Sequence, residues 1–338
     1  MDTVAVVLAG GVGTRLYPAS TADRPKQFLS FGGQSLLART VERARAVAET
    51  VYVLTRPEYE ERIPEHAPDA EVLVEPAGRD TGPALVFAAH RIREREGDHV
   101  QLVLPSDHHV EGPFASVAEQ ACEVAADTGR LVAVGVEPDR PAVGYGYVKP
   151  GTDRGDYYEA AGFFEKPSPG AAERYRYNGF YWNSGMFAWT PDALLSAARG
   201  TELDALVSGL ESGTAERAFA LAPEVSVDHA VLEQSNSVAL VPAPEGFEWD
   251  DLGTWDALAR VFSDAADDDG NVALGSGDAL TPGAEDCLIV AGENSHVSAV
   301  GVSDLTVAAY DGRVLVVPTR EAHRVREVVD RLREDGEE

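Results

Sequence analysis

Residues 8–29, LAGGVGTRLYPASTADRPKQFL, form the stretch of this chain that decides its fold. An apolar run at residues 4–8 leads into it and predicts a buried strand. Three glycines follow this strand directly: Gly10, Gly11 and Gly13. Arg15 and Lys26 lie in the same segment, so backbone N–H groups and two cations are available for a bound phosphate. The segment predicts a phosphate-binding loop at the carboxyl end of a strand; a tight turn with solvated charges is the alternative.

Two familiar phosphate loops do not fit this segment. A P-loop requires a lysine directly after its last glycine, and no lysine follows these glycines. The dinucleotide-binding fingerprint begins well at Gly11 and Gly13, but Leu16 occupies the position of its third glycine. We therefore expect a longer glycine-rich loop of a different kind.

The charge of the chain limits its partners. The 338 residues include 57 acidic and 28 basic residues, which gives a formal net charge of −29. Because a polyanion would be repelled, we expect neither nucleic acid nor a membrane surface as a partner. The acidic residues are spread along the chain, and only three of the basic residues are lysines: Lys26, Lys149 and Lys166. This composition indicates a surface adapted to a high-salt cytoplasm, with an ordinary acidic protein as the alternative.

The two cysteines, Cys122 and Cys287, lie far apart, and no C-x-x-C occurs. This spacing indicates neither a disulfide framework nor a zinc site. The first residues lead straight into a strand without the pattern of a signal peptide, and no apolar run reaches membrane-spanning length. We expect a cytoplasmic protein.

The first half of the chain alternates between two hydrophobic patterns. Short apolar runs predict strands at residues 51–55, 71–74, 100–104 and 131–136. Stretches with helical spacing lie between them, at residues 36–47, 84–96 and 116–128. This alternation predicts an α/β fold with a Rossmann-like, doubly wound and mostly parallel sheet. Because ligands of such sheets bind at the carboxyl ends of strands, we expect the chemistry just after Leu8 and Leu104.

The pattern changes at residues 264–269, DAADDD, which together with Gly270 indicate a linker. Short β-like runs follow at residues 287–290, 297–302, 306–310 and 314–317, and a helical pattern ends the chain at residues 323–333. We predict two domains, a large one at residues 1–263 and a small β-rich one with a closing helix at residues 270–338. A short left-handed β-helix is one possible form of the second domain, although no strict hexapeptide repeat is evident.

The opening loop resembles a family signature. Its pattern G-G-x-G-T-R-L-x-P followed by P-K-Q-F-L is similar to that of the sugar-nucleotide pyrophosphorylases, and the full P-K-Q-F-L to their mannose-1-phosphate guanylyltransferase branch. The resemblance implies that residues 1–263 form a nucleotidyltransferase domain, with Arg15 and Lys26 as catalytic groups at the phosphates. The nucleotide-binding residues that it implies are Leu8, Ala9, Gly10, Gly11, Gly13, Thr14, Arg15, Lys26, Arg79, Asp80, Thr81 and Ser106.

Further motifs extend the resemblance on the nucleotide side. EPAGRDTGPAL, at residues 75–85, resembles the segment that lines the base and ribose, with Gly82 in place of the usual alanine. LPSDHHV and EWDDLGTW resemble the two motifs whose aspartates, here Asp107 and Asp251, bind Mg²⁺ in the family.

Three motifs resemble segments near the sugar: VGYGYVKP, with Val143 in place of the usual threonine, FFEKP and YWNSGMF. They imply that the sugar phosphate is bound by four residues, Gly146, Glu165, Lys166 and Asn183, with Lys166 also among the catalytic groups. On the residues alone, EKP could be a charged turn, and the aromatic residues around Trp182 a core or pocket wall. Asn183 is harder to place in a core because a buried amide needs partners. A fourth motif, SVDHAVLE at residues 226–233, matches the family without an assigned role.

A metal site depends on pairing Asp107 with a second carboxylate. A lone aspartate at a strand end is most often a cap or turn residue. Mg²⁺ prefers oxygen ligands, and two aspartates from distant strand ends meet that need together with substrate phosphates. Alignment of the motif favours Asp251 over its neighbour Asp250, but the sequence alone does not choose between them. His108 and His109 do not indicate a transition-metal site, because no spaced partner histidines occur.

The resemblance implies that GTP and mannose 1-phosphate are converted to GDP-mannose and diphosphate, with Mg²⁺ as cofactor. The attacking sugar-phosphate oxygen is already ionised at neutral pH, so positioning and charge neutralisation suffice without a side-chain nucleophile. Two alternatives stay open. One is a pyrophosphorylase for glucose 1-phosphate with UTP or dTTP, and the other is a non-catalytic regulatory paralogue. We expect a homodimer, with the small C-terminal domain in self-association or in support of the catalytic domain.

Overall fold

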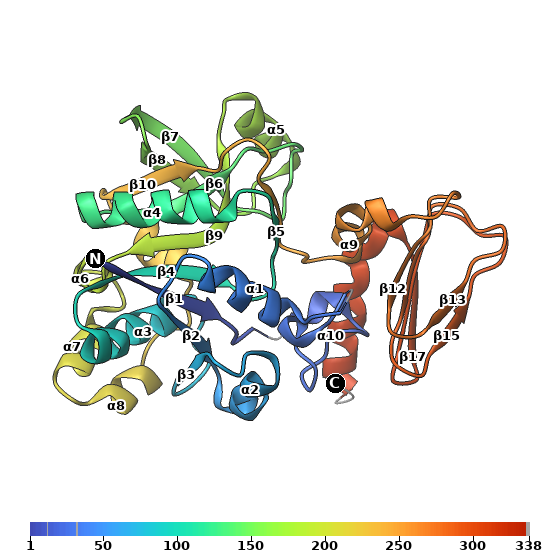
Figure 1. The fold of residues 1–338 in the computed structure, drawn as a ribbon, viewed down its shortest axis with the longest axis horizontal. Helices are drawn as coiled ribbons and strands as arrows, with labels where there is room; N and C mark the ends of the chain where they lie inside the picture. Colours follow the sequence, from blue (N-terminus) through green and yellow to red (C-terminus); the bar gives the residue numbers. More distant parts are fainter. Residues whose placement is uncertain (12, 32, 336–338) are drawn as a thin grey trace. The chain divides into compact units, whose positions relative to one another are not determined.

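The structure, a computed structural model, describes residues 1–11, 13–31 and 33–335 (Figure 1). The chain folds into two compact units, each with an apolar core of its own. The first unit comprises Met1–Gly10, Thr40–Pro105 and Val110–Trp249, and the second comprises Gly11–Arg39, Ser106–His109 and Asp250–Glu338. The glycine-rich segment therefore starts in the first unit and continues in the second.

A nine-stranded sheet with the order β3-β2-β1-β4-β9-β6-β10-β8-β7 forms the centre of the first unit. Its strands are β1 Asp2–Leu8, β2 Thr50–Thr55, β3 Glu71–Val74, β4 His99–Pro105, β6 Leu131–Val136, β7 Tyr147–Asp153, β8 Tyr158–Phe164, β9 Tyr181–Trp189 and β10 Val238–Pro242. The strands from β3 to β4 are parallel to one another, and so are β6 and β10. These are the strands that the alternating pattern predicts, apart from β10. Between the two parallel groups lies β9, which runs antiparallel to both β4 and β6.

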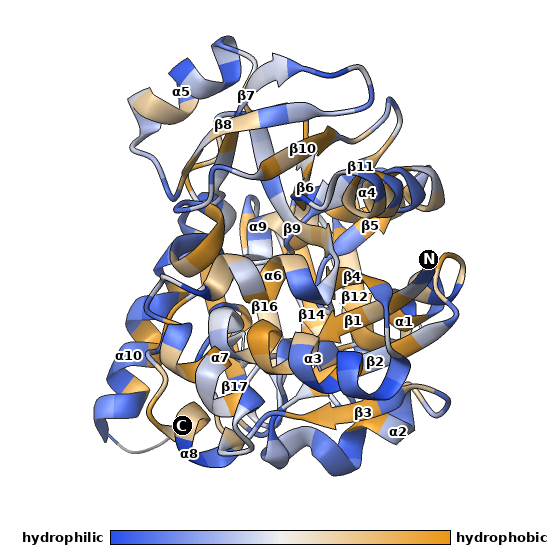
Figure 2. Ribbon diagram, turned by 90° about the vertical axis from the view of Figure 1, so that its left-hand side faces the viewer, coloured by the Kyte–Doolittle hydropathy of each residue, from blue (hydrophilic) through white to orange (hydrophobic). Residues whose placement is uncertain are grey.

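Helices cover both faces of this sheet, as the predicted doubly wound fold requires. The helices of the first unit are α1 Leu36–Arg45, which begins in the second unit, α2 Ile63–His66, α3 Thr81–Glu96, α4 Phe114–Thr128, α5 Pro169–Tyr177, α6 Pro191–Ala198, α7 Asp204–Glu211 and α8 Ala215–Ala220. Val4 and Val6 of β1 belong to a core that α3, α6 and α7 share, whereas Ala5 and Val7 point to the opposite face because side chains alternate along a strand. Helix α4 lies across the sheet from α3 (Figure 1), and its residues are not part of that core. Burial on both faces explains the apolar composition of β1 (Figure 2).

The carboxyl ends of three strands meet at one edge of the sheet. Leu8 pairs in register with Leu54 of β2 and with Pro105 of β4. Beyond the strand, the Ala9 amide donates to the Leu54 carbonyl at 2.8 Å, and the Thr55 hydroxyl donates to the Ala9 carbonyl at 3.0 Å. The loops that follow β1, β2 and β4 therefore leave the sheet from the same edge, where α/β proteins bind their ligands.

The second unit contains the β-rich tail and the closing helix that the sequence predicts. Three parallel rungs, β12 Val272–Gly275, β14 Leu288–Ala291 and β16 Leu305–Tyr310, stack side by side, and β17 Arg313–Pro318 adds an antiparallel edge. A second parallel pair consists of β13 Asp278–Leu280 and β15 His296–Ser298. The chain then forms a 3-10 helix, η6 Thr319–Arg324, and α10 Val325–Asp335.

The core of the second unit includes the segment that follows the glycines. Leu16 and Phe31 are fully buried in one cluster with Trp255 of α9, Trp255–Val261, and with Leu288 of β14. The Trp255 indole donates to the Tyr17 carbonyl at 3.1 Å. Arg24 lies over the ring of Tyr310 and donates to the Asp311 carboxylate and to the carbonyls of Ala19 and Pro18. The C-terminal residues thus anchor residues 13–31 by packing and hydrogen bonds.

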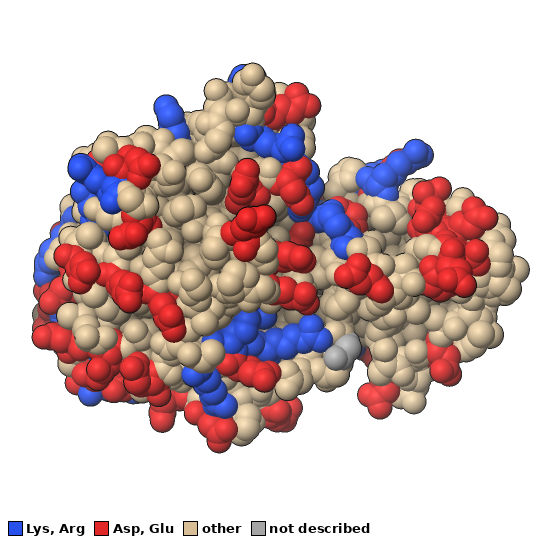
Figure 3. Space-filling model, turned by 45° about the horizontal axis from the view of Figure 1, so that its top comes forward, with Lys and Arg blue, Asp and Glu red and all other residues tan. Residues whose placement is uncertain are grey.

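Acidic side chains are spread over the visible surfaces of both units rather than gathered in one region (Figure 3). No helix within the described ranges is long and apolar enough to span a membrane.

Candidate active site

The glycine-rich segment turns sharply at Gly13, where φ is 69°. A Cβ at this position would come within 2.6 Å of the Lys26 Cβ, so both the backbone conformation and the space require glycine. The 3-10 helix η1, Thr14–Leu16, follows at once and buries Leu16 while Arg15 stays 55% exposed. A second 3-10 helix, η2 Lys26–Phe28, brings Lys26 back to the turn.

Lys26 is the centre of a cluster of charged residues in the second unit. Its side chain is only 5% exposed, and Nζ donates to the Asp107 carboxylate at 2.9 Å and to the Asp251 carbonyl. A buried ammonium is tolerated only with such partners. The structure therefore brings together three residues, Lys26, Asp107 and Asp251, that are far apart in the sequence and that the family motifs single out.

Burial shifts the pKa values of Asp107 and its neighbour His108 in opposite directions. Burial raises the pKa of Asp107, but the charge of Lys26 and, to a smaller degree, His108 outweigh it and hold this pKa below its ordinary value. Burial lowers the pKa of His108, which favours the neutral imidazole. At neutral pH the cluster thus contains an ionised Asp107 carboxylate beside the Lys26 ammonium.

The two neighbouring aspartates differ in their surroundings. The Asp250 carboxylate is buried, and it accepts hydrogen bonds from the Arg260 guanidinium at 2.8 Å and from the Leu252 amide at 2.9 Å. The Asp251 carboxylate is 20% exposed, accepts from the Gly253 amide at 2.8 Å and lies 3.8 Å from the Arg15 guanidinium. Asp250 is therefore engaged by the protein, whereas Asp251 retains oxygen atoms for a ligand.

The residues at the amino end of α3 are held by the protein backbone. Asp80, with φ of 66°, caps the helix and accepts from the Thr81 amide at 2.6 Å, while Arg79 donates to the Ala220 carbonyl at 2.9 Å. A Cβ on Gly82 would approach the Val225 carbonyl oxygen to 2.6 Å. This contact explains why glycine replaces the usual alanine of the motif in this chain.

A buried ion pair at the edge of the sheet was not expected from the sequence. Glu75 is 6% exposed, and its Oε1 lies 3.7 Å from Arg56 Nε, while Oε2 and that Nε have no hydrogen-bond partner among the described residues. Burial raises the pKa of Glu75 to about 7, although Arg56 opposes the shift. Gly10 and Gly78 leave room for the pair, because a Cβ would lie 3.0 Å from Glu75 Oε1 and 2.5 Å from the Arg56 guanidinium carbon, respectively. The first residue of the EPAGRD motif was the only signal for it.

The motifs implied for the sugar converge in the first unit. A Cβ on Gly146 would lie 2.5 Å from a Glu165 carboxylate oxygen and 3.5 Å from the Asn183 Cβ. The Asn183 amide nitrogen donates to the Asp228 carboxylate at 2.6 Å. Lys166, with φ of 41°, keeps its Nζ 3.9 Å from Glu165 and is 75% exposed. Gly146, Glu165 and Asn183 thus share one cluster with Lys166 at its exposed side.

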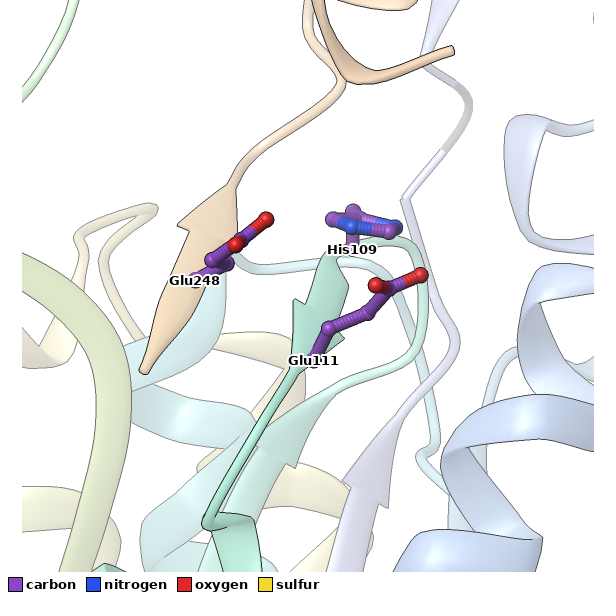
Figure 4. Close-up of side chains that lie close together, drawn as sticks. All are labelled: His109, Glu111 and Glu248. Carbon is purple, nitrogen blue, oxygen red and sulfur yellow. The ribbon is translucent and has the colours of Figure 1, made fainter. Parts of the chain in front are cut away.

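Two acidic side chains outside these clusters lie on short paired strands. Figure 4 shows Glu111 on β5, His109–Glu111, and Glu248 on β11, Glu248–Asp250. Both are exposed, and exposed acidic groups on neighbouring strands are common in proteins without a bound ion. We assign no site to this pair.

Comparison with known proteins gives the family. Residues 4–268 match the nucleotidyl transferase family, and residues 284–332 match the mannose-phosphate isomerase/GMP-like β-helix domain. A putative mannose-1-phosphate guanylyltransferase of Vibrio cholerae is 34% identical over 98% of this chain and 75% of its own length. The mannose-1-phosphate guanylyltransferase of Escherichia coli K12 is 33% identical over 98% of this chain and 73% of its own.

A solved structure from Thermus thermophilus, described as a mannose-1-phosphate geranyltransferase, superposes with a TM-score of 0.89. It is 37% identical, and the match covers 98% of this chain and 100% of that one. Likeness of this extent includes both the sheet of the first unit and the β-rich tail. The chain therefore belongs to the nucleotidyl transferase family, in the branch of the mannose-1-phosphate guanylyltransferases.

Proposed function

We propose that this protein transfers a guanylyl group from GTP to mannose 1-phosphate and releases diphosphate. The observation that carries the proposal is the buried Lys26, held by Asp107 and by the Asp251 carbonyl next to the turn at Gly13. A lysine and two carboxylates at the end of a glycine-rich loop suit a nucleoside triphosphate and a cation better than a neutral ligand. We infer the sugar, mannose, and the base, guanine, from the names of the relatives.

The chemistry requires little more than positioning and charge neutralisation. An ionised oxygen of mannose 1-phosphate attacks the α-phosphorus of GTP, and the bond from that phosphorus to the diphosphate oxygen breaks. Arg15 and Lys26 neutralise the triphosphate and the departing diphosphate, while Lys166 binds the sugar phosphate. The backbone of the segment around Gly10, Gly11 and Gly13 supplies N–H donors to the phosphates.

Nucleotidyltransferases of this family generally use a divalent metal, and we propose Mg²⁺ held by Asp107 and Asp251. The residues fit this ion, because both offer carboxylate oxygens and Asp251 is not engaged by an arginine as closely as Asp250 is. When bound, the ion would reduce the repulsion between the two phosphate-bearing substrates. The Asp107 carboxylate would then contact both the Lys26 ammonium and the ion.

On the sugar side, we propose that Gly146, Glu165 and Asn183 bind the hexose. Glu165 and Asn183 offer an acceptor and a donor for hydroxyl groups, and Gly146 leaves the space for the Glu165 carboxylate. On the nucleotide side, the proposal assigns contacts to Leu8, Ala9, Thr14, Arg79, Asp80, Thr81 and Ser106, as the family motifs imply.

A panel of substrates tests the proposal. The protein is incubated with GTP, UTP or dTTP and with mannose 1-phosphate or glucose 1-phosphate, and released diphosphate is measured, with Lys26→Ala as the control. We expect the highest kcat/KM for GTP with mannose 1-phosphate. A higher value for UTP or dTTP would overturn the guanylyl assignment. If no pair released diphosphate, the alternative of a non-catalytic regulatory paralogue would be favoured.

We further propose a boundary between a catalytic domain at residues 1–263 and a support domain at residues 270–338, in a cytoplasmic homodimer. Arg24 lies over the Tyr310 ring and donates to the Asp311 carboxylate, and these contacts support a role for the tail in holding residues 13–31. Light scattering and activity of residues 1–265 against the full chain test it. A fragment as active and stable as the full chain, with an unchanged number of subunits per assembly, would refute this role.

A further inference from the structure

Asp228 lies in the first unit at the centre of the sugar cluster, and none of the family motifs assigns it a role. Its carboxylate accepts a hydrogen bond from the Asn183 side chain, with 2.6 Å between Nδ2 and Oδ1. Among the described residues, this is its only hydrogen bond with another side chain. Glu165 lies close enough for its charge to act on the Asp228 carboxylate.

The orientation of the Asn183 amide is fixed on both sides. Its Oδ1 accepts from the Gly185 amide at 3.1 Å, so the NH₂ group is turned toward Asp228. The Asn183 backbone amide donates to the Gly146 carbonyl at 2.9 Å, which joins β9 to the residue that precedes β7. The NH₂ group thus keeps one hydrogen for a further partner, and the carboxylate of Asp228 keeps acceptor positions.

The backbone at Asp228 departs from ordinary helical geometry. Asp228–Leu232 forms a single turn of π-helix, in which the Glu233 amide donates to the Asp228 carbonyl at 2.8 Å. Such turns occur frequently at functional sites, because they re-aim side chains at the cost of the regular hydrogen-bond pattern. This turn begins at Asp228, the residue that accepts the hydrogen bond from Asn183.

The same segment is bonded to the amino end of α3. The Val227 amide donates to the Thr81 hydroxyl at 3.0 Å, and the Gly82 amide donates to the Val225 carbonyl at 3.0 Å. Asp228 is therefore fixed in position by backbone contacts on one side and by Asn183 on the other. A carboxylate held in this way is preorganised to bind a ligand group at a defined position.

The electrostatic setting is unfavourable for a purely structural carboxylate. Burial raises the pKa of Asp228 to about 6; the hydrogen bond from Asn183 opposes the shift, whereas Glu165 and Glu233 add to it. In the described residues, neither Lys nor Arg forms an ion pair with Asp228. The charge of Glu165 thus acts on Asp228, while the nearby ammonium of Lys166 lies 3.9 Å from Glu165 and is largely exposed. A hydroxyl donor from a ligand would relieve this arrangement.

We propose that Asp228 is a sugar-specificity residue, which accepts a hydrogen bond from one hexose hydroxyl and orients the Asn183 amide to donate to the same hydroxyl oxygen. A hydroxyl is both donor and acceptor, so it can donate one hydrogen bond to Asp228 and accept another from Asn183. The inference rests on the proposed function, because it takes the hexose 1-phosphate as the ligand of this cluster. Sites built to bond a hydroxyl strongly reject analogues that lack it.

The test uses the full-length protein with Asp228→Ala and Asp228→Asn, and Glu233→Gln as the matched control. Glu233 is a carboxylate of the same segment that pairs with His229 at 3.0 Å rather than with Asn183. In both Asp228 variants we expect the KM for mannose 1-phosphate to rise about tenfold or more, as for loss of a charged hydrogen bond. The KM for GTP should stay within about twofold, and Glu233→Gln should change neither value by more than about twofold.

Monodeoxy analogues of mannose 1-phosphate identify the contact. Against the wild type, one analogue should lose about tenfold or more in kcat/KM, and the same analogue should lose almost nothing further against Asp228→Asn. Equal losses for every analogue in wild type and variant would overturn the proposal, as would equal rises in both KM values. Wild-type protein without activity would overturn the proposed function instead. If Asp228→Ala does not fold, Asp228→Asn alone tests the proposal.

Discussion

The Lys26 ammonium donates a hydrogen bond to the Asp107 carboxylate at 2.9 Å from a side chain that is almost fully buried. Two other residues shape this contact. Gly13 leaves the space that the Lys26 side chain occupies, and the Asp251 carbonyl accepts a second hydrogen bond from the same ammonium. A compact cation with three donors suits this position, because a planar guanidinium directs its donors in a fixed fork. The relationship explains why lysine persists here in a chain with very few lysines.

Lys26→Arg should therefore lower kcat/KM by about tenfold or more although the charge is kept, which corresponds to about 1.4 kcal/mol of transition-state stabilisation. The larger head group cannot reach both Asp107 and the Asp251 carbonyl in the same space. Steady-state kinetics with GTP as the varied substrate measure the effect, and Lys149→Arg on β7 is the control. Kinetics like those of the wild type in Lys26→Arg would show that the loop needs charge but not the shape of lysine.

Asp251→Asn should lower kcat by about 10²-fold or more, as for loss of a preorganised electrostatic element, with little change in stability. Asp250→Asn should instead lower the free energy of unfolding by about 1–3 kcal/mol, because the bond from the Arg260 guanidinium to a buried carboxylate is weakened. Kinetics and urea unfolding of both variants separate the two roles. The reverse pattern, with activity lost in Asp250→Asn, would mean that the wrong neighbour was assigned.

Glu75 should make the stability of the protein depend on pH. Its pKa in the folded protein is about 7, above the ordinary value of 4.5, so the folded state binds more protons than the unfolded state between these values. Stability should then fall as the pH rises through this range, by about 3 kcal/mol at most, and level off above pH 7. Glu75→Gln should remove this fall. The measurement is the free energy of unfolding of wild type and variant from pH 5 to 8, and parallel curves for the two would contradict the assignment.

The elements could be predicted from the sequence where they depend on local patterns. The strands β1, β2, β3, β4 and β6 and the helices α1, α3 and α4 follow from hydrophobic periodicity, and the β-rich tail with its closing helix follows in the same way. The insertion of β9 between β4 and β6 could not be predicted, because antiparallel pairing over this distance leaves no periodic signal. For the same reason, nothing in the residues showed that Leu16 and Trp255 share a core.

The candidate site was predictable only as far as its motifs reach. The convergence of Lys26 with Asp107 depends on contacts over 81 positions, and family resemblance rather than chemistry pointed to it. Arg260, which binds the Asp250 carboxylate, stands ten positions away from it on another element, so this contact could not be read from the sequence. The pair of Arg56 and Glu75 and the bond from Asn183 to Asp228 needed the structure, because burial and orientation are not visible in the sequence.

Stability should rise with salt concentration. The net charge of −29 and the spread of acidic side chains over the surface (Figure 3) imply self-repulsion that mobile ions screen. We expect the melting temperature to increase between low and molar KCl. An unchanged melting temperature would show that the acidic surface does not limit stability.

The central claim is a direct transfer of the guanylyl group from GTP to mannose 1-phosphate at the cluster of Lys26, Asp107 and Asp251. The most direct measurement is a single turnover with GTP labelled at the α-phosphorus, quenched over time and analysed for label in GDP-mannose and on the protein. We predict that all of the transferred label appears in GDP-mannose, that none is bound to protein at any time, and that Lys26→Ala slows the transfer strongly. Label on the protein, or no labelled GDP-mannose from the wild type, would contradict the account.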